Sequence, residues 1–74
     1  MTPDAFRAAL AALGLTQVGV NGADRFLGVD GRTVRRWISG ELSIPGSVAM
    51  LLRVMLARRL SVATVRKICD MTDA

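Results

Sequence analysis

Residues 26–37 of the chain read FLGVDGRTVRRW and have the pattern of two helices joined by a tight turn. Gly28 suits the turn, because glycine adopts positive φ angles without a steric penalty. Asp30 is a favourable N-cap, since its side chain accepts a hydrogen bond from an amide in the first helical turn. We therefore predict that one helix stops at Gly28 and that a second runs from Gly31 to about Ser39, with Gly40 as its terminator.

The second of these helices has two chemically different faces. Its apolar stripe and the residue that fills the turn are expected to pack in the core; they are Val29, Val34, Trp37 and Ile38. The other face carries Arg32, Thr33, Arg35 and Arg36. Arginine has a planar guanidinium that bonds bidentately to phosphate or to guanine. We interpret Trp37 as a core residue that anchors this basic face, rather than as an aromatic that stacks on bases.

The sequence before the motif predicts a first helix. Thr2 is a good N-cap and Pro3 suits the first helical position, so we expect a helix from Pro3 to about Leu13. Gly14 then ends the helix, and Leu15 folds back onto it as a hydrophobic contact.

Two starts are open for the helix that precedes the turn. Thr16 can cap a helix over residues 17–27, whereas Asn21 can cap a shorter one. Gly19 and Gly22 weaken the early part of the longer helix. Since both alternatives contain residues 23–27, we place the two helices of the motif at about residues 17–39.

Two further helices are predicted at about residues 45–71. Pro45 opens a helix to about Arg59, and Ser61 caps a last helix from Val62 to about Met71. The fourth helix is apolar all round, with a core stripe made of Val48, Leu51, Leu52 and Met55. Its second stripe lies on nearly the opposite side and consists of Met50, Val54 and Ala57. The inner side of the fifth helix consists of Val62, Val65, Ile68 and Cys69.

Length and composition agree with one all-α domain over residues 1–74, a compact bundle of about five helices. The 74 residues are 51% hydrophobic but only 4% aromatic, and no long alternation of apolar and polar residues predicts a strand. Cys69 is the only cysteine and histidine is absent, so neither a disulfide nor an ordinary zinc site is expected. We expect no metal, no cofactor and no small-molecule ligand.

The charge of the chain suits a polyanionic partner. The formal net charge is +4, and nine of the ten basic residues are arginine. The most apolar stretch, residues 48–60, is interrupted by Arg53 and is too short to cross a bilayer. Because no targeting segment is visible and the single cysteine suits a reducing compartment, we expect a cytoplasmic protein that does not bind membranes.

The motif resembles the core of the lambda-repressor-like (Cro-type, or XRE) helix-turn-helix family. The resemblance rests on residues 27–37, on Ser39-Gly40-Glu41 and Ile44-Pro45 after them, and on residues 13–17 before them. It implies a bacterial or phage DNA-binding protein, associated with the nucleoid, whose second motif helix enters the major groove. The simplest function is that of a transcriptional regulator, and in particular a repressor of a promoter.

The resemblance also implies a division of roles among the site residues. Arg32 and Arg36 share a face at i, i+4, and we expect them to contact base edges, with Thr33 and Gly31 in support. The expected phosphate contacts come from Arg35, Ser39, Gly40, Gln17 and Asn21. Gln17 and Asn21 both stand in this set because three additional residues separate Gln17 from the turn.

We expect the protein to be a homodimer that binds a pseudo-palindromic operator. The core of so short a chain is small, and one motif contacts only half a site. The expected interface consists of Met50, Val54, Ala57, Val62 and Val65.

Two alternatives use the same fold. One is a protein-interaction module, such as an anti-activator or a complex subunit, that uses the apolar face of the last two helices. The other is an architectural or recombination accessory protein that bends DNA. An enzyme is not expected, because the chain has no histidine, no phosphate-cradling glycine loop and no carboxylate pair in a catalytic setting.

Overall fold

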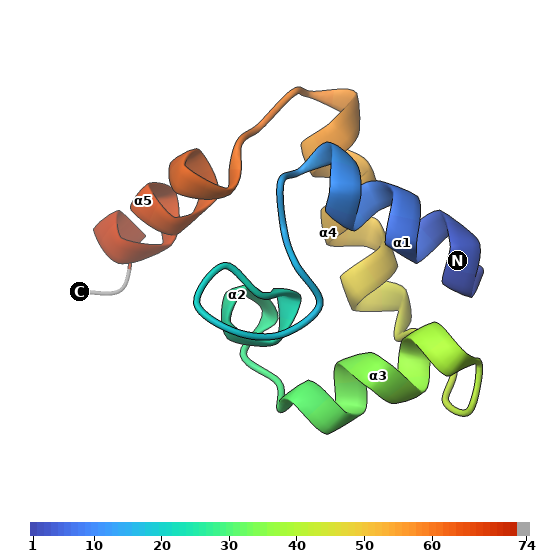
Figure 1. The fold of residues 1–74 in the computed structure, drawn as a ribbon. Helices are drawn as coiled ribbons and strands as arrows, with labels where there is room; N and C mark the ends of the chain where they lie inside the picture. Colours follow the sequence, from blue (N-terminus) through green and yellow to red (C-terminus); the bar gives the residue numbers. More distant parts are fainter. Residues whose placement is uncertain (73–74) are drawn as a thin grey trace.

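The chain folds into five α-helices in residues 1–72, the part that the computed structural model describes (Figure 1). The helices are α1 (Pro3–Ala12), α2 (Ala23–Leu27), α3 (Gly31–Ser39), α4 (Gly46–Ala57) and α5 (Val62–Thr72). No strand occurs in this range, so the all-α prediction is confirmed. The last two residues of the predicted domain lie outside the described range.

The two ends of α1 follow the predicted capping signals. The Thr2 hydroxyl accepts a hydrogen bond from the Ala5 amide at 3.1 Å. At the other end Gly14 has a φ of 73°, and the Leu15 amide donates to the Leu10 carbonyl at 2.9 Å. This pattern closes the last turn, and it brings Leu15 into the core as predicted.

The start of α2 differs from both predicted alternatives. Residues 17–22 form a loop, and the N-cap is Gly22 rather than Thr16 or Asn21. Helical backbone is interrupted at Gly19, whose φ of 109° is open to glycine but not to ordinary residues. The prediction that the motif begins at about residue 17 is therefore wrong.

Backbone hydrogen bonds close this loop on itself. The Thr16 amide donates to the Asn21 carbonyl at 2.9 Å, and the Ala23 amide donates to the Thr16 carbonyl at 2.8 Å. Gly22 is buried against the rest of this loop, and a Cβ atom at this position would lie 2.6 Å from the Gly19 nitrogen. The loop thus needs glycine at position 22, and it feeds the chain into α2 at Ala23.

The core lies where α1, α3 and α4 meet, and α2 packs beside α3. Its buried members come from all of the first four helices and, in the case of Leu15, from the loop after α1: Phe6, Ala9, Leu10, Leu15, Ala23, Val34, Trp37, Ile38 and Leu52. Met55 is also fully buried, whereas Leu51, predicted to face the core, is 36% exposed. The core stripe of α4 includes the buried Ala49 in its place.

The end of α4 and the direction of α5 depend on an unusual residue. The helix ends at Ala57, two residues before the predicted end, because Arg59 takes a left-handed φ of 53°. The Leu60 amide then donates to the Met55 carbonyl at 2.8 Å, which completes a closing turn. The Ser61 hydroxyl accepts from the Thr64 amide at 3.0 Å, so the predicted cap of α5 is confirmed.

The α5 helix runs out to the side of the bundle (Figure 1). Val62 packs on the core cluster and Val65 is half-buried, but Ile68 is 49% exposed and Cys69 is exposed. Ile68 and Cys69 were predicted on the inner side and are both exposed, although Cys69 lines a groove with Phe26 and Leu51. None of the helices in residues 1–72 has the length and apolar character that a membrane-spanning segment needs.

Candidate nucleic-acid interface

One face of α3 is fixed in the core. Val34 is fully buried, and Trp37 is only 3% exposed. The Trp37 ring meets the Phe6 ring of α1 edge to face, with 5.8 Å between centroids and 88° between planes. The interpretation of Trp37 as a core residue is confirmed. Because this face is held by packing, the opposite face of α3 has a defined orientation towards solvent.

The turn between α2 and α3 has the predicted geometry. Gly28 has a φ of 71°, and the Val29 amide donates to the Asp24 carbonyl at 3.0 Å. Val29 is half-buried against the core cluster. Asp30 is the N-cap of α3, and its carboxylate accepts from the Thr33 amide at 2.7 Å. The turn at Gly28 and the cap at Asp30 together determine the position of the first helical turn of α3.

The carboxylate of Asp30 has a lowered pKa. The hydrogen bonds from Thr33 are the largest cause, and the positive charges of Arg32 and Arg36 lower the pKa further. The ordinary value for this group is 3.8. A lowered pKa in the folded state means that the contribution of Asp30 to stability is fully present above 3.8 and is lost as the pH falls through the folded value.

We expect Asp30→Asn to remove the part of the pH dependence of the free energy of unfolding that comes from the Asp30 carboxylate. At neutral pH the variant is less stable than the parent, because asparagine keeps the cap hydrogen bond without its charge. At pH values below the folded pKa of Asp30 the gap narrows, since the parent carboxylate is then protonated. Urea unfolding at neutral and acidic pH measures the gap, with Asp70→Asn on α5 as a control for net charge. A gap that is equal at both pH values would contradict the prediction.

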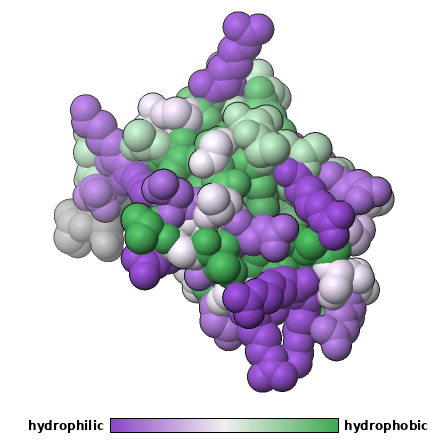
Figure 2. All heavy atoms as spheres, in the orientation of Figure 1, coloured by the Kyte–Doolittle hydropathy of each residue, from purple (hydrophilic) through white to green (hydrophobic). Residues whose placement is uncertain are grey.

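The solvent-facing side of α3 carries the arginines. The side chains of Arg32 and Arg35 are exposed and that of Arg36 is half-exposed. They line a shallow depression of about 320 Å³ together with Ser39 and Glu41. Figure 2 shows hydrophilic side chains gathered at the edge of the molecule where α3 lies, beside an apolar centre. The structure thus brings the three predicted arginines to one surface.

Glu41 belongs to this surface and was not among the predicted site residues. Its carboxylate forms an ion pair with the Nε atom of Arg36 at 3.6 Å. The signal available in the sequence was an acidic residue directly after the glycine that ends the helix. Sequence reasoning missed it because the backbone reverses at Gly40, which has a φ of 82°.

The remaining predicted residues of α3 lie around the same surface. Thr33 is half-exposed, and Ser39 and Gly40 are exposed at the end of the helix. Gly31 is half-buried, and a Cβ atom there would lie 2.8 Å from Cγ1 of Val18. Packing of the loop against α3 therefore explains the absence of a side chain at position 31.

Gln17 and Asn21 lie outside the helices. Both residues are exposed in the loop that precedes α2. Asn21 accepts the Thr16 amide through its backbone carbonyl, and its side chain does not cap α2, whose N-cap is Gly22. The two side chains are open to solvent, but the structure does not join them to the arginine surface.

The predicted dimer residues fall into two groups. Met50 is 66% exposed and Val54 is 48% exposed on the outer side of α4, where Ala57 is also exposed. Val62 packs on the core of the same chain, and Val65 lines an apolar groove with Phe26 of α2 and Leu51 of α4. The Arg66 guanidinium lies over the Phe26 ring at 5.8 Å from its centroid.

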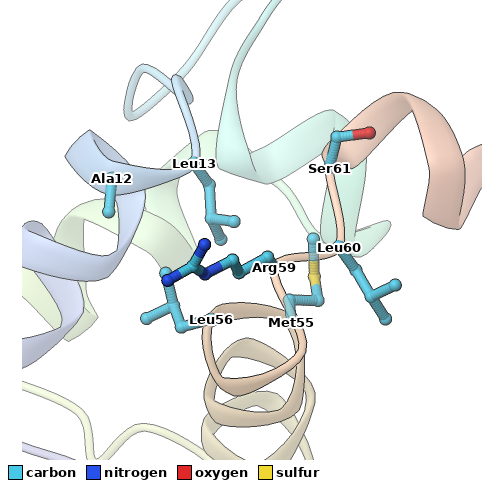
Figure 3. Close-up of a pocket in the computed structure, with 7 residues that line it drawn as sticks. All are labelled: Ala12, Leu13, Met55, Leu56, Arg59, Leu60 and Ser61. Carbon is cyan, nitrogen blue, oxygen red and sulfur yellow. The ribbon is translucent and has the colours of Figure 1, made fainter.

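A second depression lies at the C-terminal end of α4 (Figure 3). Its volume is about 350 Å³, and it is lined by Ala12, Leu13, Met55, Leu56, Arg59, Leu60 and Ser61. The Arg59 side chain extends across it towards Leu56 and α1. The lining is apolar apart from Arg59 and Ser61, and it contains no carboxylate.

The fold and this surface define a class of architecture: a small all-α protein in which a short helix, a glycine turn and a capped helix form one unit. Comparisons with protein-family models, with curated proteins and with solved structures found no match to the chain.

Proposed function

We propose that this protein binds double-stranded DNA sequence-specifically and regulates transcription, most simply as a repressor. The observation that carries the proposal is the division of α3 into two faces. Val34 and Trp37 anchor one face in the core, while Arg32 and Arg36 project from the other. A rigid helix with donors on its outer face is the element that the major groove admits and that reads base edges.

The proposed contacts follow from the position of each residue on α3. Arg32 and Arg36 contact guanine O6 and N7, since they lie one turn apart on one face. Thr33, in the first turn, contacts a thymine methyl or a phosphate. Arg35, which is offset around the helix, contacts phosphate together with Ser39 and Gly40 at the helix end. The net charge of +4 favours association with DNA in general.

A resemblance to lambda-repressor-like proteins supports the same proposal. The turn glycine, the Asp30 cap and the buried Trp37 have the local geometry that the motif requires. The closed loop before α2 accommodates the additional residues without changing the turn. Gln17 and Asn21 are exposed and remain the proposed phosphate contacts of this loop.

We further propose a homodimer formed through the outer face of α4. Met50 and Val54 are large apolar side chains left largely in solvent, and α5 does not cover them. A second copy would bury this stripe, with Ala57 beside it and Val65 at its edge. Two copies of α3 about 34 Å apart would then read the two halves of a pseudo-palindromic operator.

We expect Met50→Glu with Val54→Glu to give a folded monomer. Burying the two carboxylates in an apolar interface is unfavourable, and operator affinity should fall by about 100-fold because the two half-sites are no longer bound together. Sedimentation velocity and fluorescence anisotropy measure the two effects, with the exposed Ala8→Glu as a control. A parent protein that sediments as a monomer, both free and on DNA, would refute the dimer.

One observation favours a second candidate function, that of a protein-interaction module. The exposed apolar residues of α4 are followed by Ile68 and Met71 on α5, which are 49% and 75% exposed. In that case the arginines of α3 would be dispensable for function.

A binding selection with randomised duplex DNA at fixed salt separates the candidates. Enrichment of a two-fold-symmetric sequence that contains guanine supports the proposed regulator. Binding without sequence preference indicates an architectural protein instead, and absence of binding indicates a protein-interaction module.

A further inference from the structure

The strongest unassigned feature of the molecule is the ion pair between Arg36 and Glu41. The Glu41 carboxylate lies 3.6 Å from Arg36 Nε, with the Arg36 side chain 40% exposed and the Glu41 side chain 66% exposed. Both residues line the depression that also contains Arg32, Arg35 and Ser39. An acidic side chain on a surface that suits a polyanion requires an explanation, because it weakens attraction to phosphate.

The loop that carries Glu41 is tied to the backbone of Arg36. The Leu42 amide and the Ser39 hydroxyl both donate to the Arg36 carbonyl, each at 3.1 Å. The Glu41 amide donates in turn to the Ser39 hydroxyl oxygen at 3.4 Å. The loop is therefore held by the backbone carbonyl of Arg36, and its Glu41 carboxylate forms an ion pair with the side chain of the same arginine.

We propose that Glu41 is a positioning residue that determines the sequence specificity of Arg36. This inference rests on the proposed DNA-binding function and deepens it. A carboxylate at the Nε edge of a guanidinium leaves the edge formed by Nη1 and Nη2 open. That free edge carries two parallel donors, and guanine O6 and N7 are the matching pair of acceptors.

The negative charge of Glu41 also acts against the wrong ligand. A phosphate that approached Arg36 from the Glu41 side would meet a like charge at close range. Guanine presents neutral acceptors and carries no such penalty. Glu41 therefore lowers the affinity for unrelated DNA more than it lowers the affinity for the operator. The sequence specificity then comes partly from repulsion of the wrong ligand.

The test compares Glu41→Gln with the parent protein on two duplexes, the preferred sequence and one with its guanines replaced. We expect the ratio of the two affinities to fall by about two- to fivefold, which is the range for a solvent-exposed ion pair. On the duplex without guanines, the salt dependence of the dimer should steepen by about 1.8 in log–log slope, because Arg36 of each subunit is free to neutralise one more phosphate. Asp70→Asn makes the same charge change on α5 and should leave the ratio unchanged.

A double-mutant cycle shows whether Glu41 acts through Arg36. In an Arg36→Ala background, Glu41→Gln should no longer change the ratio. Thermal unfolding of each variant establishes that it is folded. An affinity ratio that Glu41→Gln leaves unchanged, or one that it lowers equally in the Arg36→Ala background, overturns the inference while the proposed function stands. A parent protein with no preference between the duplexes overturns the proposed function, and this inference with it.

Discussion

Replacement of Trp37 by alanine is expected to destabilise the protein by about 3–5 kcal/mol, the range for removing a large buried aromatic side chain. Trp37 is 3% exposed and joins α3 to α1 through its contact with Phe6. A chain of 74 residues has a total stability of only about 4–11 kcal/mol. The melting temperature should therefore fall by about 15 °C or more.

Circular dichroism at 222 nm measures this effect, because the only tryptophan is the residue removed. Val20→Ala is the control, since Val20 is 75% exposed outside the proposed dimer interface and its truncation should change stability by no more than about 0.5 kcal/mol. A Trp37→Ala variant that melts within a few degrees of the parent and keeps its DNA affinity would show that Trp37 does not anchor α3.

The double replacement Arg32→Ala with Arg36→Ala is expected to abolish specific binding. Each bidentate contact to guanine discriminates by about 1–3 kcal/mol, and a dimer makes each contact twice. Affinity for the operator should therefore fall by about 1000-fold or more, to the level of unrelated DNA. Both side chains lie outside the core, and the Arg36–Glu41 ion pair is exposed to solvent, so the melting temperature of the variant should stay within a few degrees of that of the parent.

Arg35→Ala is the control on the same helix. Its exposed side chain is assigned to phosphate, so its loss should weaken operator and unrelated DNA alike and reduce the salt slope of the dimer by about 1.8, or about 0.9 for each subunit. Titrations by fluorescence anisotropy at several salt concentrations distinguish the two patterns. If the double variant and Arg35→Ala lower affinity for every sequence equally, the division of the arginines into base readers and phosphate contacts is wrong.

The parts of the fold that sequence predicts well are those that depend on neighbouring residues. The α3 helix begins and ends where Asp30 and Gly40 indicate, because cap and terminator act over only a few residues. The same holds for Thr2 and Gly14 at the ends of α1. The buried face of α3 follows from its apolar spacing, and the arginine surface is the complement of that face.

The parts that it misses depend on how the backbone turns between helices. The loop before α2 is closed by hydrogen bonds of Thr16 with Asn21 and Ala23. Gly19 and Gly22 disfavour a longer helix, but no local propensity predicts which backbone groups close the loop. At the other end of the chain, the left-handed Arg59 turns α5 aside, although an arginine carries no signal for such a turn. That change of direction leaves Cys69 exposed where periodicity alone predicts burial.

The residues of the candidate site divide in the same way into those that sequence predicts and those that it misses. Arg32, Arg35 and Arg36 were predictable because a helix places them together. Glu41 was not, because its contact with Arg36 depends on how the chain reverses after Gly40.

Methylation interference on the selected duplex tests the proposal that α3 reads guanine in the major groove. Methylation at guanine N7 removes the acceptor that Arg32 and Arg36 are proposed to use. We predict that it blocks binding at two groups of guanines whose centres lie about one helical turn, or about 10 base pairs, apart. Interference confined to adenine N3 in the minor groove, or binding that tolerates guanine N7 methylation throughout the duplex, would show that α3 does not read guanine in the major groove.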